Sequence, residues 1–178
     1  MITKPIALWL TGLPASGKTT IAKELTHLLA QEKIFCQILD SDEMRRRLTP
    51  NPTYSEAERD QFYRTLAYIA ELLVSNGVPV IIAATGHKQH YRDAARAHIA
   101  NFAEIYVKCS LATAMARDKK GIYQMAQEGK ATAVPGLQVP YEAPASPEIT
   151  VDSEAQSAAN CARKIFNHLT QQGTMKLK

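Results

Sequence analysis

The sequence predicts an α/β fold in which a parallel five-stranded sheet is covered by helices on both faces. Short apolar runs alternate with longer amphipathic stretches along most of the 178 residues, which is the pattern of repeated strand–helix units. A glycine-rich stretch, GLPASGKTT, joins the first apolar run to the first amphipathic stretch. The length suits one hydrophobic core better than two. We therefore expect a single domain over residues 1–178.

The first half of the chain contains two expected strands and two clear helices. IALWLT (6–11) reads as a buried strand, and a helix is expected from Lys18 to about Ala30. FCQILD (35–40) is a second strand, followed by a short helix at EMRRRL. A long helix is expected over 55–77, because Ser55 can cap it, Glu58 completes a capping box and Gly77 can end it.

The second half contains three more expected strands. VPVIIAA (78–84) is continuously apolar, which suits a strand covered on both faces. A helix over about 90–101 leads to the strand AEIYVKC (103–109) and a short helix at LATAMARD (111–118). ITV (149–151) is a weak fifth strand, and a last helix runs over about 153–171. The terminal MKLK is expected to be frayed.

Residues 119–147 break this pattern. KKGIYQMAQEGK favours a helix with a basic start, whereas ATAVPGLQVPYEAPASP is rich in proline and has no clear period. A compact domain seldom carries such a stretch without a use for it. We expect a mobile lid or substrate-binding loop; the alternative is a surface loop without a function.

Composition excludes several classes of protein. The net charge is +4, but the basic residues are scattered and lack a basic repeat with interleaved aromatics, so we expect a pocket for an anionic small molecule and not a nucleic-acid surface. No apolar run approaches the roughly 20 residues that span a bilayer, so we expect a cytoplasmic protein. Cys36, Cys109 and Cys161 show neither metal-ligand spacing nor a disulfide framework.

The glycine-rich stretch predicts a phosphate-binding loop of the P-loop NTPase type. Gly12, Gly17, Lys18 and Thr19 fit the pattern G-x-x-x-x-G-K-[ST]. The glycines allow the backbone to curl around phosphates, and the following helix directs its positive end toward them. Lys18 reaches the β- and γ-phosphates, and Thr19 can hold Mg²⁺. We therefore expect this loop to bind the phosphates of a nucleoside triphosphate together with Mg²⁺.

The motifs that follow favour a small-molecule kinase over other P-loop proteins. A guanine-nucleotide switch needs a base-reading motif such as N-K-x-D, which is absent, and the third apolar run, VPVIIAATG, ends without an acid. In small kinases of this fold the acid often comes from the second strand, where LDSD (39–42) provides it. A module that only hydrolyses or senses ATP is the alternative, but such a module needs no acceptor pocket.

Asp40 and Asp42 fall at the carboxyl end of the second strand, beside the loop, where open α/β sheets bind ligands. A kinase needs one carboxylate near the acceptor hydroxyl and another near Mg²⁺. If the strand continues, D-x-D spacing points both side chains the same way, with Asp42 on the acceptor side. The alternative is that Asp42 only caps the next helix. One or two of the arginines 45–47 can face an anion, and Arg59 can add a second contact.

At this point the sequence resembles the adenylylsulfate (APS) kinase family of P-loop kinases. The resemblance covers residues 5–153 and rests on several blocks in the family's order: GLPASGKTT, LDSDEMR, YSEAER, RDAAR, RDKKGIY and PYEAPASPEITVD. These kinases use MgATP to phosphorylate the 3′-hydroxyl of adenosine 5′-phosphosulfate, which gives PAPS. Family members are often dimers, so the resemblance implies a homodimer.

The resemblance also assigns roles to individual residues. Lys18, Asp42 and Lys120 are implied as catalytic, with Lys120 closing over the transferring phosphate from the lid. Asp40 lies with Asp42 beside the acceptor, and Thr19 holds Mg²⁺. Arg45 and Arg59 hold the anionic group of the acceptor, and Tyr54 takes the place of a phenylalanine near its base. The implied ATP-binding residues are Gly12, Leu13, Pro14, Ala15, Ser16, Gly17, Lys18, Thr19, Thr20 and Arg117.

Three departures from the family pattern fall on the acceptor side. The family's I-S-P-Y-R is replaced by residues 85–89, T-G-H-K-Q, so the serine that is phosphorylated in the family is Gly86. The family's asparagine is Phe62. The family's F-T-G-I-D is V-P-G-L-Q at 134–138, so Val134 cannot stack on adenine as an aromatic ring does.

These departures leave the acceptor open between APS and another nucleotide-linked anion, such as the cytidine diphosphate derivative CDP-phosphoramidate. The further residues expected to contact the acceptor are Phe62, Thr85, His87, Lys88, Val134 and Leu137. For His87 the alternative is a loop residue without a role in binding.

Overall fold

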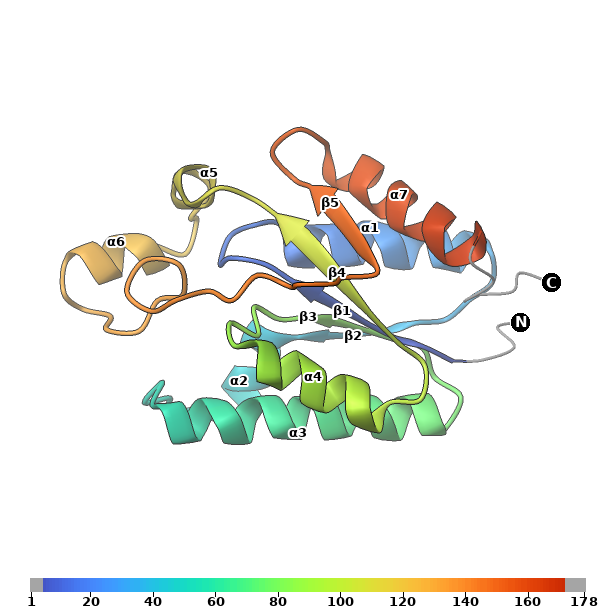
Figure 1. Cartoon of the computed structure of the whole chain (residues 1–178), viewed down its shortest axis with the longest axis horizontal. Helices are drawn as coiled ribbons and strands as arrows, with labels where there is room; N and C mark the ends of the chain where they lie inside the picture. The colour runs from blue at the N-terminus through green and yellow to red at the C-terminus, as the bar shows by residue number, and fades with distance from the viewer. Residues whose placement is uncertain (1–4, 172–178) are drawn as a thin grey trace.

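The fold is built on one parallel sheet. The computed structural model describes residues 5–171, and in these the strands follow the order β2-β3-β1-β4-β5. All neighbouring strands are parallel (Figure 1), which confirms the predicted fold class. The strands are β1 (Ala7–Thr11), β2 (Gln37–Asp40), β3 (Val80–Ala83), β4 (Phe102–Lys108) and β5 (Ile149–Asp152).

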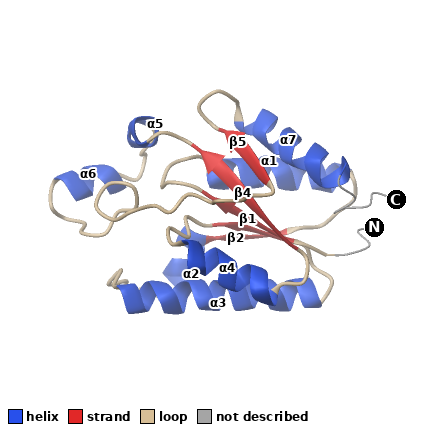
Figure 2. Cartoon of the chain, in the orientation of Figure 1, coloured by secondary structure: helices blue, strands red, loops and turns tan. Residues whose placement is uncertain are grey.

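Helices cover both faces of the sheet. α1 (Lys18–Gln31) and α7 (Ala158–Gln171) lie on one face, and α3 (Glu56–Ser75) and α4 (Gln89–His98) lie on the other (Figures 1 and 2). Three shorter helices lie toward the carboxyl ends of the strands: α2 (Ser41–Leu48), α5 (Leu111–Ala116) and α6 (Ile122–Gln127). The loops and short helices at this edge hold the residues that the sequence singles out.

The core consists of two layers that share the central strand. In β1, Leu8 and Leu10 belong to the cluster under α1 and α7, whereas Ala7 and Trp9 belong to the cluster under α3 and α4. Successive side chains of a strand point to opposite faces, so β1 is apolar from Ala7 to Leu10 because both of its faces are covered. All four side chains are at most 1% exposed. The sheet is therefore a fixed base for the loops at its carboxyl edge.

The predicted elements occur in the predicted order, with shifted ends. α3 is capped by Ser55, whose Oγ accepts a hydrogen bond from the Glu58 N–H at 3.4 Å, but it ends at Ser75, two residues before Gly77. The helix expected over 119–130 is only Ile122–Gln127. Gly121 and Gly129, with φ of 67° and 71°, bound it on either side.

The last helix also starts later than predicted. The Asp152 carboxylate accepts hydrogen bonds from the backbone N–H groups of Glu154 at 2.9 Å and Ala155 at 3.1 Å. This local pairing makes a turn in place of the first helical turn, because an Asp side chain can satisfy the N–H groups that follow it. The helix therefore begins at Ala158. The terminal MKLK lies outside the described residues.

The three cysteines lie in separate parts of the fold. Cys36, Cys109 and Cys161 are buried free thiols, and within residues 5–171 no three or more His, Cys, Asp and Glu side chains are grouped so that they could hold a metal ion by themselves. In the same range, none of the helices has the length and apolar character to cross a bilayer.

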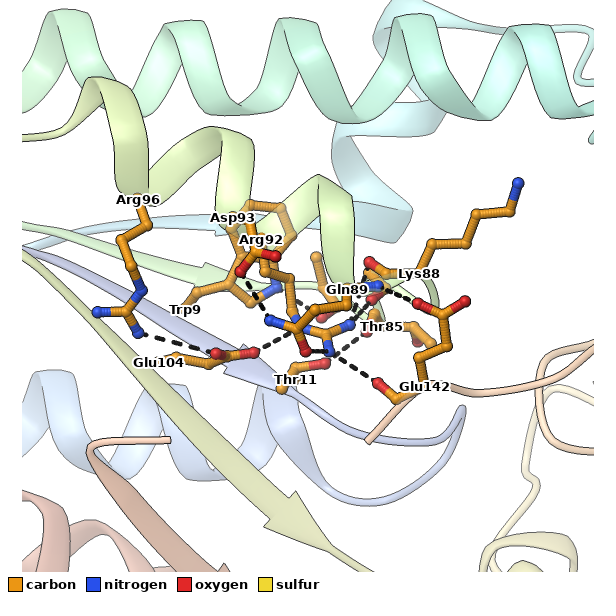
Figure 3. Close-up of polar contacts among 12 residues, drawn as sticks. Trp9, Thr11, Thr85, Lys88, Gln89, Arg92, Asp93, Arg96, Glu104 and Glu142 are labelled. Carbon is orange, nitrogen blue, oxygen red and sulfur yellow. Dashed lines mark hydrogen bonds and ion pairs between the residues drawn. The ribbon is translucent and has the colours of Figure 1, made fainter. Parts of the chain in front are cut away.

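A fully buried arginine fixes the loop that follows β3. The Arg92 side chain donates to Glu104 Oε1 at 2.5 Å, to the Glu142 carbonyl at 2.7 Å and to the Lys88 carbonyl at 3.2 Å, and it also binds the Gly86 carbonyl (Figure 3). It thus holds residues 86–88 and the end of the expected lid against α4. Because Arg92 and Glu104 are 0% and 3% exposed, each charge depends on the other for compensation.

We expect Arg92→Met to lower the free energy of unfolding by about 3 to 5 kcal/mol, because it leaves the buried Glu104 carboxylate without its main partner. The matched control is Arg96→Met. Arg96 lies one turn later on α4, is 37% exposed and pairs with Glu148, and it also lies 3.7 Å from the Glu104 carboxylate. Because Arg96 is partly exposed and its contact with Glu104 is longer than that of Arg92, its loss should cost only about 1 kcal/mol. Urea denaturation of both variants measures this. Equal losses of unfolding free energy in the two variants would show that the buried Arg92–Glu104 pair has no special stabilising role.

Candidate functional site

The turn between β1 and α1 forms one side of the site. Gly12 has a φ of 155°, and a Cβ at this position would lie 2.5 Å from the Val107 carbonyl oxygen, so no larger residue fits without rearrangement. Gly17, with a φ of 94°, is the N-cap residue of α1, which begins at Lys18. The positive end of the α1 dipole therefore faces the turn, where it would favour an anion.

Lys18 is held inside this turn. Its Nζ donates to the carbonyls of Gly12 at 3.0 Å and Leu13 at 2.7 Å. Burial lowers the pKa of Lys18 to about 8, against the opposing effect of Asp42 and Asp40. A phosphate in the turn would supply the countercharge that restores the charged form.

Asp40 links the turn to the next element. Its Oδ2 accepts a hydrogen bond from Thr19 Oγ1 at 2.6 Å, and its Oδ1 accepts from the N–H groups of Asp42 at 2.9 Å and Glu43 at 3.2 Å. Asp40 is therefore the N-cap of α2. The idea that Asp42 caps this helix is wrong, and so is the idea of a continued strand, because the chain turns into α2 directly after Asp40.

With the cap supplied by Asp40, the Asp42 carboxylate is free to contact the lid. It forms an ion pair with Lys120, and the two side chains are 49% and 62% exposed. A pair this exposed contributes little to stability. The contact nevertheless brings a cation of the 119–147 segment to the acid at the start of α2.

The 119–147 segment lies over the turn and over the start of α3. Tyr123 Oη donates to the Pro14 carbonyl at 3.0 Å, and Arg59 Nη2 donates to the Ala133 carbonyl at 2.7 Å. A Cβ on Gly136 would lie 2.4 Å from Leu13 Cδ2. The segment therefore contacts both sides of the site.

Arginines and aromatic rings form the side opposite the turn. The Arg45 guanidinium carbon lies 3.9 Å from the centre of the Phe62 ring and 5.1 Å from that of Tyr54. Arg45 Nη1 donates to Glu58 Oε1 at 2.8 Å. Burial lowers the pKa of Arg59, whose Nε donates to the Tyr54 carbonyl at 3.0 Å.

A cavity of about 1390 Å³ joins the two sides. Pockets for one drug-sized ligand usually measure about 300 to 1000 Å³, so this cavity has the size for two ligands side by side. The predicted site residues that line it are Pro14, Ala15, Gly17, Lys18, Thr19, Thr20, Asp40, Asp42, Arg45, Tyr54, Arg59, Thr85, Arg117, Lys120 and Val134.

Other predicted residues lie outside the lining. Phe62 is 1% exposed and lies behind Arg45, whereas Leu137 is 39% exposed. Lys88 pairs with Glu56. Four more predicted site residues do not line the cavity: Gly12, Leu13, Ser16 and His87.

His87 is buried beneath the acceptor side. It is 4% exposed, its ring lies 5.6 Å from that of Tyr91, and its Nδ1 has no hydrogen-bond partner within residues 5–171. Burial, together with the nearby positive charges of Arg59 and Lys88, lowers the pKa of His87 to about 4. His87 is therefore neutral near pH 7.

Two residues that contribute to the site were not predicted from the sequence to do so. Tyr63 lines the cavity, and its Oη accepts a hydrogen bond from the Gly86 N–H at 3.1 Å. Glu58 was expected only to cap α3, yet it also binds Arg45. The capping-box spacing located Glu58, but its contact with Arg45 depends on how α2 packs on α3, and no local pattern encodes that.

Comparison with known proteins gives consistent matches. The profile of the adenylylsulphate kinase family matches residues 4–152. An adenylyl-sulfate kinase of Microcystis aeruginosa is 32% identical over 173 residues, which cover 97% of this chain and 96% of that protein. A probable adenylyl-sulfate kinase of Aeropyrum pernix is 38% identical over 160 residues, which cover 88% of this chain and 87% of that protein. The structure of a Mycobacterium tuberculosis APS kinase in complex with AMPPNP and APS superposes with a TM-score of 0.88 at 29% identity, covering 93% and 98%.

The low pKa of His87 predicts a loss of stability in mild acid. The unfolded chain binds a proton near pH 6.5, whereas the folded chain resists it until about pH 4. Stability is therefore full above pH 6.5 and falls as the pH drops toward 4, by about 2 to 3 kcal/mol in total. Urea denaturation from pH 7 to 4.5 measures the fall.

His87→Asn should flatten this part of the pH profile. His27→Asn, at an exposed position, should leave it unchanged and serves as the control. A wild-type profile that His87→Asn does not alter would contradict the assignment.

Proposed function

The chain belongs to the adenylylsulphate kinase family, and we propose that it transfers the γ-phosphate of ATP to the 3′-hydroxyl of adenosine 5′-phosphosulfate, giving PAPS and ADP. The observation that carries the proposal is the shared cavity: a P-loop turn lines one side, and Asp42 with two arginines lines the other. Only a reaction between two bound molecules needs both sides in one space.

On the donor side, the turn and Lys18 would bind the ATP phosphates. The backbone around Gly17 and the start of α1 offer a positive field, and Lys18 Nζ lies among the loop carbonyls, within reach of a bound phosphate. Arg117 lines the same cavity and donates to the Ser153 carbonyl at 2.9 Å. We propose that Arg117 borders the site of the nucleoside.

Thr19 and Asp40 would hold Mg²⁺. Their side-chain oxygens lie 2.6 Å apart, and a hydroxyl with a carboxylate is the kind of oxygen pair that suits this ion alongside substrate phosphates. When bound, Mg²⁺ neutralises charge on the β- and γ-phosphates.

On the acceptor side, Asp42 would orient the 3′-hydroxyl and accept its proton. The hydroxyl oxygen attacks the γ-phosphorus, and the bond from that phosphorus to the β–γ bridging oxygen breaks to leave ADP. Lys120, already beside Asp42, would approach the transferring phosphoryl group and offset its charge. The lid would exclude water, which otherwise competes as the acceptor.

A second acceptor class is favoured by the wall near Val134. This residue lines the cavity and is 5% exposed, so the wall there is aliphatic and offers a base no aromatic ring at that position. A smaller pyrimidine base, as in a cytidine diphosphate derivative, would lose less from the absence of stacking. The phosphoryl transfer itself would be unchanged.

We further propose that the enzyme works in the cytoplasm, where ATP is abundant, and that it forms a homodimer. The dimer rests on the family resemblance. Light scattering on the eluate of a size-exclusion column tests it directly.

The acceptor is tested by Mg²⁺- and ATP-dependent release of ADP. We expect rapid release with APS and slow release without an acceptor. A panel of cytidine and other nucleotide-linked anions runs in parallel. Rapid ADP release with a member of the panel, and none with APS, would show that this member and not APS is the acceptor. ADP release that no acceptor stimulates would contradict a kinase function.

Asp42→Asn should lower kcat roughly 10²- to 10⁴-fold, because it removes the group that accepts the proton in the transition state. ATP affinity should stay within about twofold, since the P-loop is untouched. Glu43→Gln removes the same charge from the neighbouring position of α2 and should keep nearly full activity. An Asp42→Asn variant as active as the wild type would refute the role of Asp42.

A further inference from the structure

The Glu58 carboxylate, on α3, accepts hydrogen bonds from three residues in two other parts of the acceptor side. Its Oε1 accepts from Arg45 Nη1 of α2 at 2.8 Å. Its Oε2 accepts from Thr53 Oγ1 at 2.8 Å and from the Tyr54 N–H at 3.1 Å, and the Thr53 N–H also points to it. One side chain therefore connects α2, the loop before α3, and α3 itself.

The first effect is on Arg45. Its guanidinium stacks on the Phe62 ring at 3.9 Å, its edge is bound by Glu58, and its side chain is only 12% exposed. An arginine on a flexible stem usually samples many rotamers, and fixing it costs entropy when a ligand binds. Here the ring and the carboxylate fix it before any ligand arrives.

The second effect is on Tyr54. Its backbone has a φ of 54°, a region that aromatic residues rarely occupy. The Tyr54 N–H binds Glu58 and its carbonyl binds Arg59 Nε at 3.0 Å, so both ends of the unusual conformation are held. Tyr54 as a whole is 46% exposed, and it lines the cavity.

Glu58 carries out this role as an ion. Burial alone would raise its pKa, but hydrogen bonds from Thr53 and Tyr54 and the charge of Arg45 outweigh burial, so the pKa is lowered. The charge matters because it both strengthens the hydrogen bonds and compensates the guanidinium that stacks on Phe62.

We propose that Glu58 is a positioning residue for acceptor binding: it presets the Arg45 guanidinium and the Tyr54 ring against which the acceptor nucleotide docks. The proposal rests on the proposed kinase function and deepens its acceptor site. Glu58 does not line the cavity and binds no residue of the turn at 12–20. Its effect should therefore appear in acceptor binding and not in ATP binding.

The test is steady-state kinetics of Glu58→Gln with APS and ATP varied in turn. Loss of a charge-assisted hydrogen bond predicts a rise in the KM for APS of roughly tenfold, with the KM for ATP within twofold of wild type. The matched control is Ser55→Ala. Ser55 caps the same turn of α3, so its loss weakens the helix start without touching Arg45. It should lower Tm and leave both KM values unchanged.

A double-variant cycle separates positioning from general weakening. If Glu58 acts through Arg45, then adding Arg45→Lys to Glu58→Gln should raise the KM for APS less than the product of the two single effects. If the rise in the KM for APS in the double variant equals the product of the two single rises, the positioning role is overturned. A Glu58→Gln variant with a wild-type KM for APS would overturn it too, and in either case the kinase function stands. A wild-type protein that phosphorylates no nucleotide acceptor would overturn the function and this inference together.

Discussion

One carboxylate joins the two sides of the site. Asp40 ends β2, binds Thr19 of the phosphate-binding turn and caps α2. A single side chain therefore fixes the position of the acceptor side relative to the donor side. The parallel sheet makes this possible, because Asp40 pairs in register with Ala83 of β3, whose neighbour is β1. The position of Asp42, Arg45 and the rest of α2 follows from this cap.

Behind the cavity, two charged side chains, the buried Arg92 and the partly buried Glu58, fix the surfaces that ligands would meet. Arg92 holds the loop after β3 through backbone carbonyls, and Glu58 holds Arg45 and the loop before α3. In both cases a charged side chain that does not line the cavity restricts groups that line or flank it. Such preorganisation reduces the entropy lost on binding and keeps reacting groups within the narrow tolerance that catalysis needs.

Sequence patterns predicted what is local and missed what depends on packing. The turn at 12–20, the order of strands and helices along the chain and the Ser55 cap follow from local sequence, and the structure contains them. The role of Asp40 as the cap of α2 was missed because it depends on where β2 stops. Glu58 was located by its spacing from Ser55, but its bond to Arg45 requires the tertiary contact of α2 with α3. Similarly, nothing local placed Phe62 behind Arg45 rather than in the cavity.

The central claim is that a phosphoryl group crosses this cavity from ATP to a nucleotide hydroxyl. The most direct measurement is ³¹P NMR of the products formed from MgATP and APS by the purified protein. We predict a new phosphomonoester signal coupled to the 3′-position of the acceptor, with ADP in equal amount. ADP accompanied by inorganic phosphate, with APS unchanged, would contradict the claim.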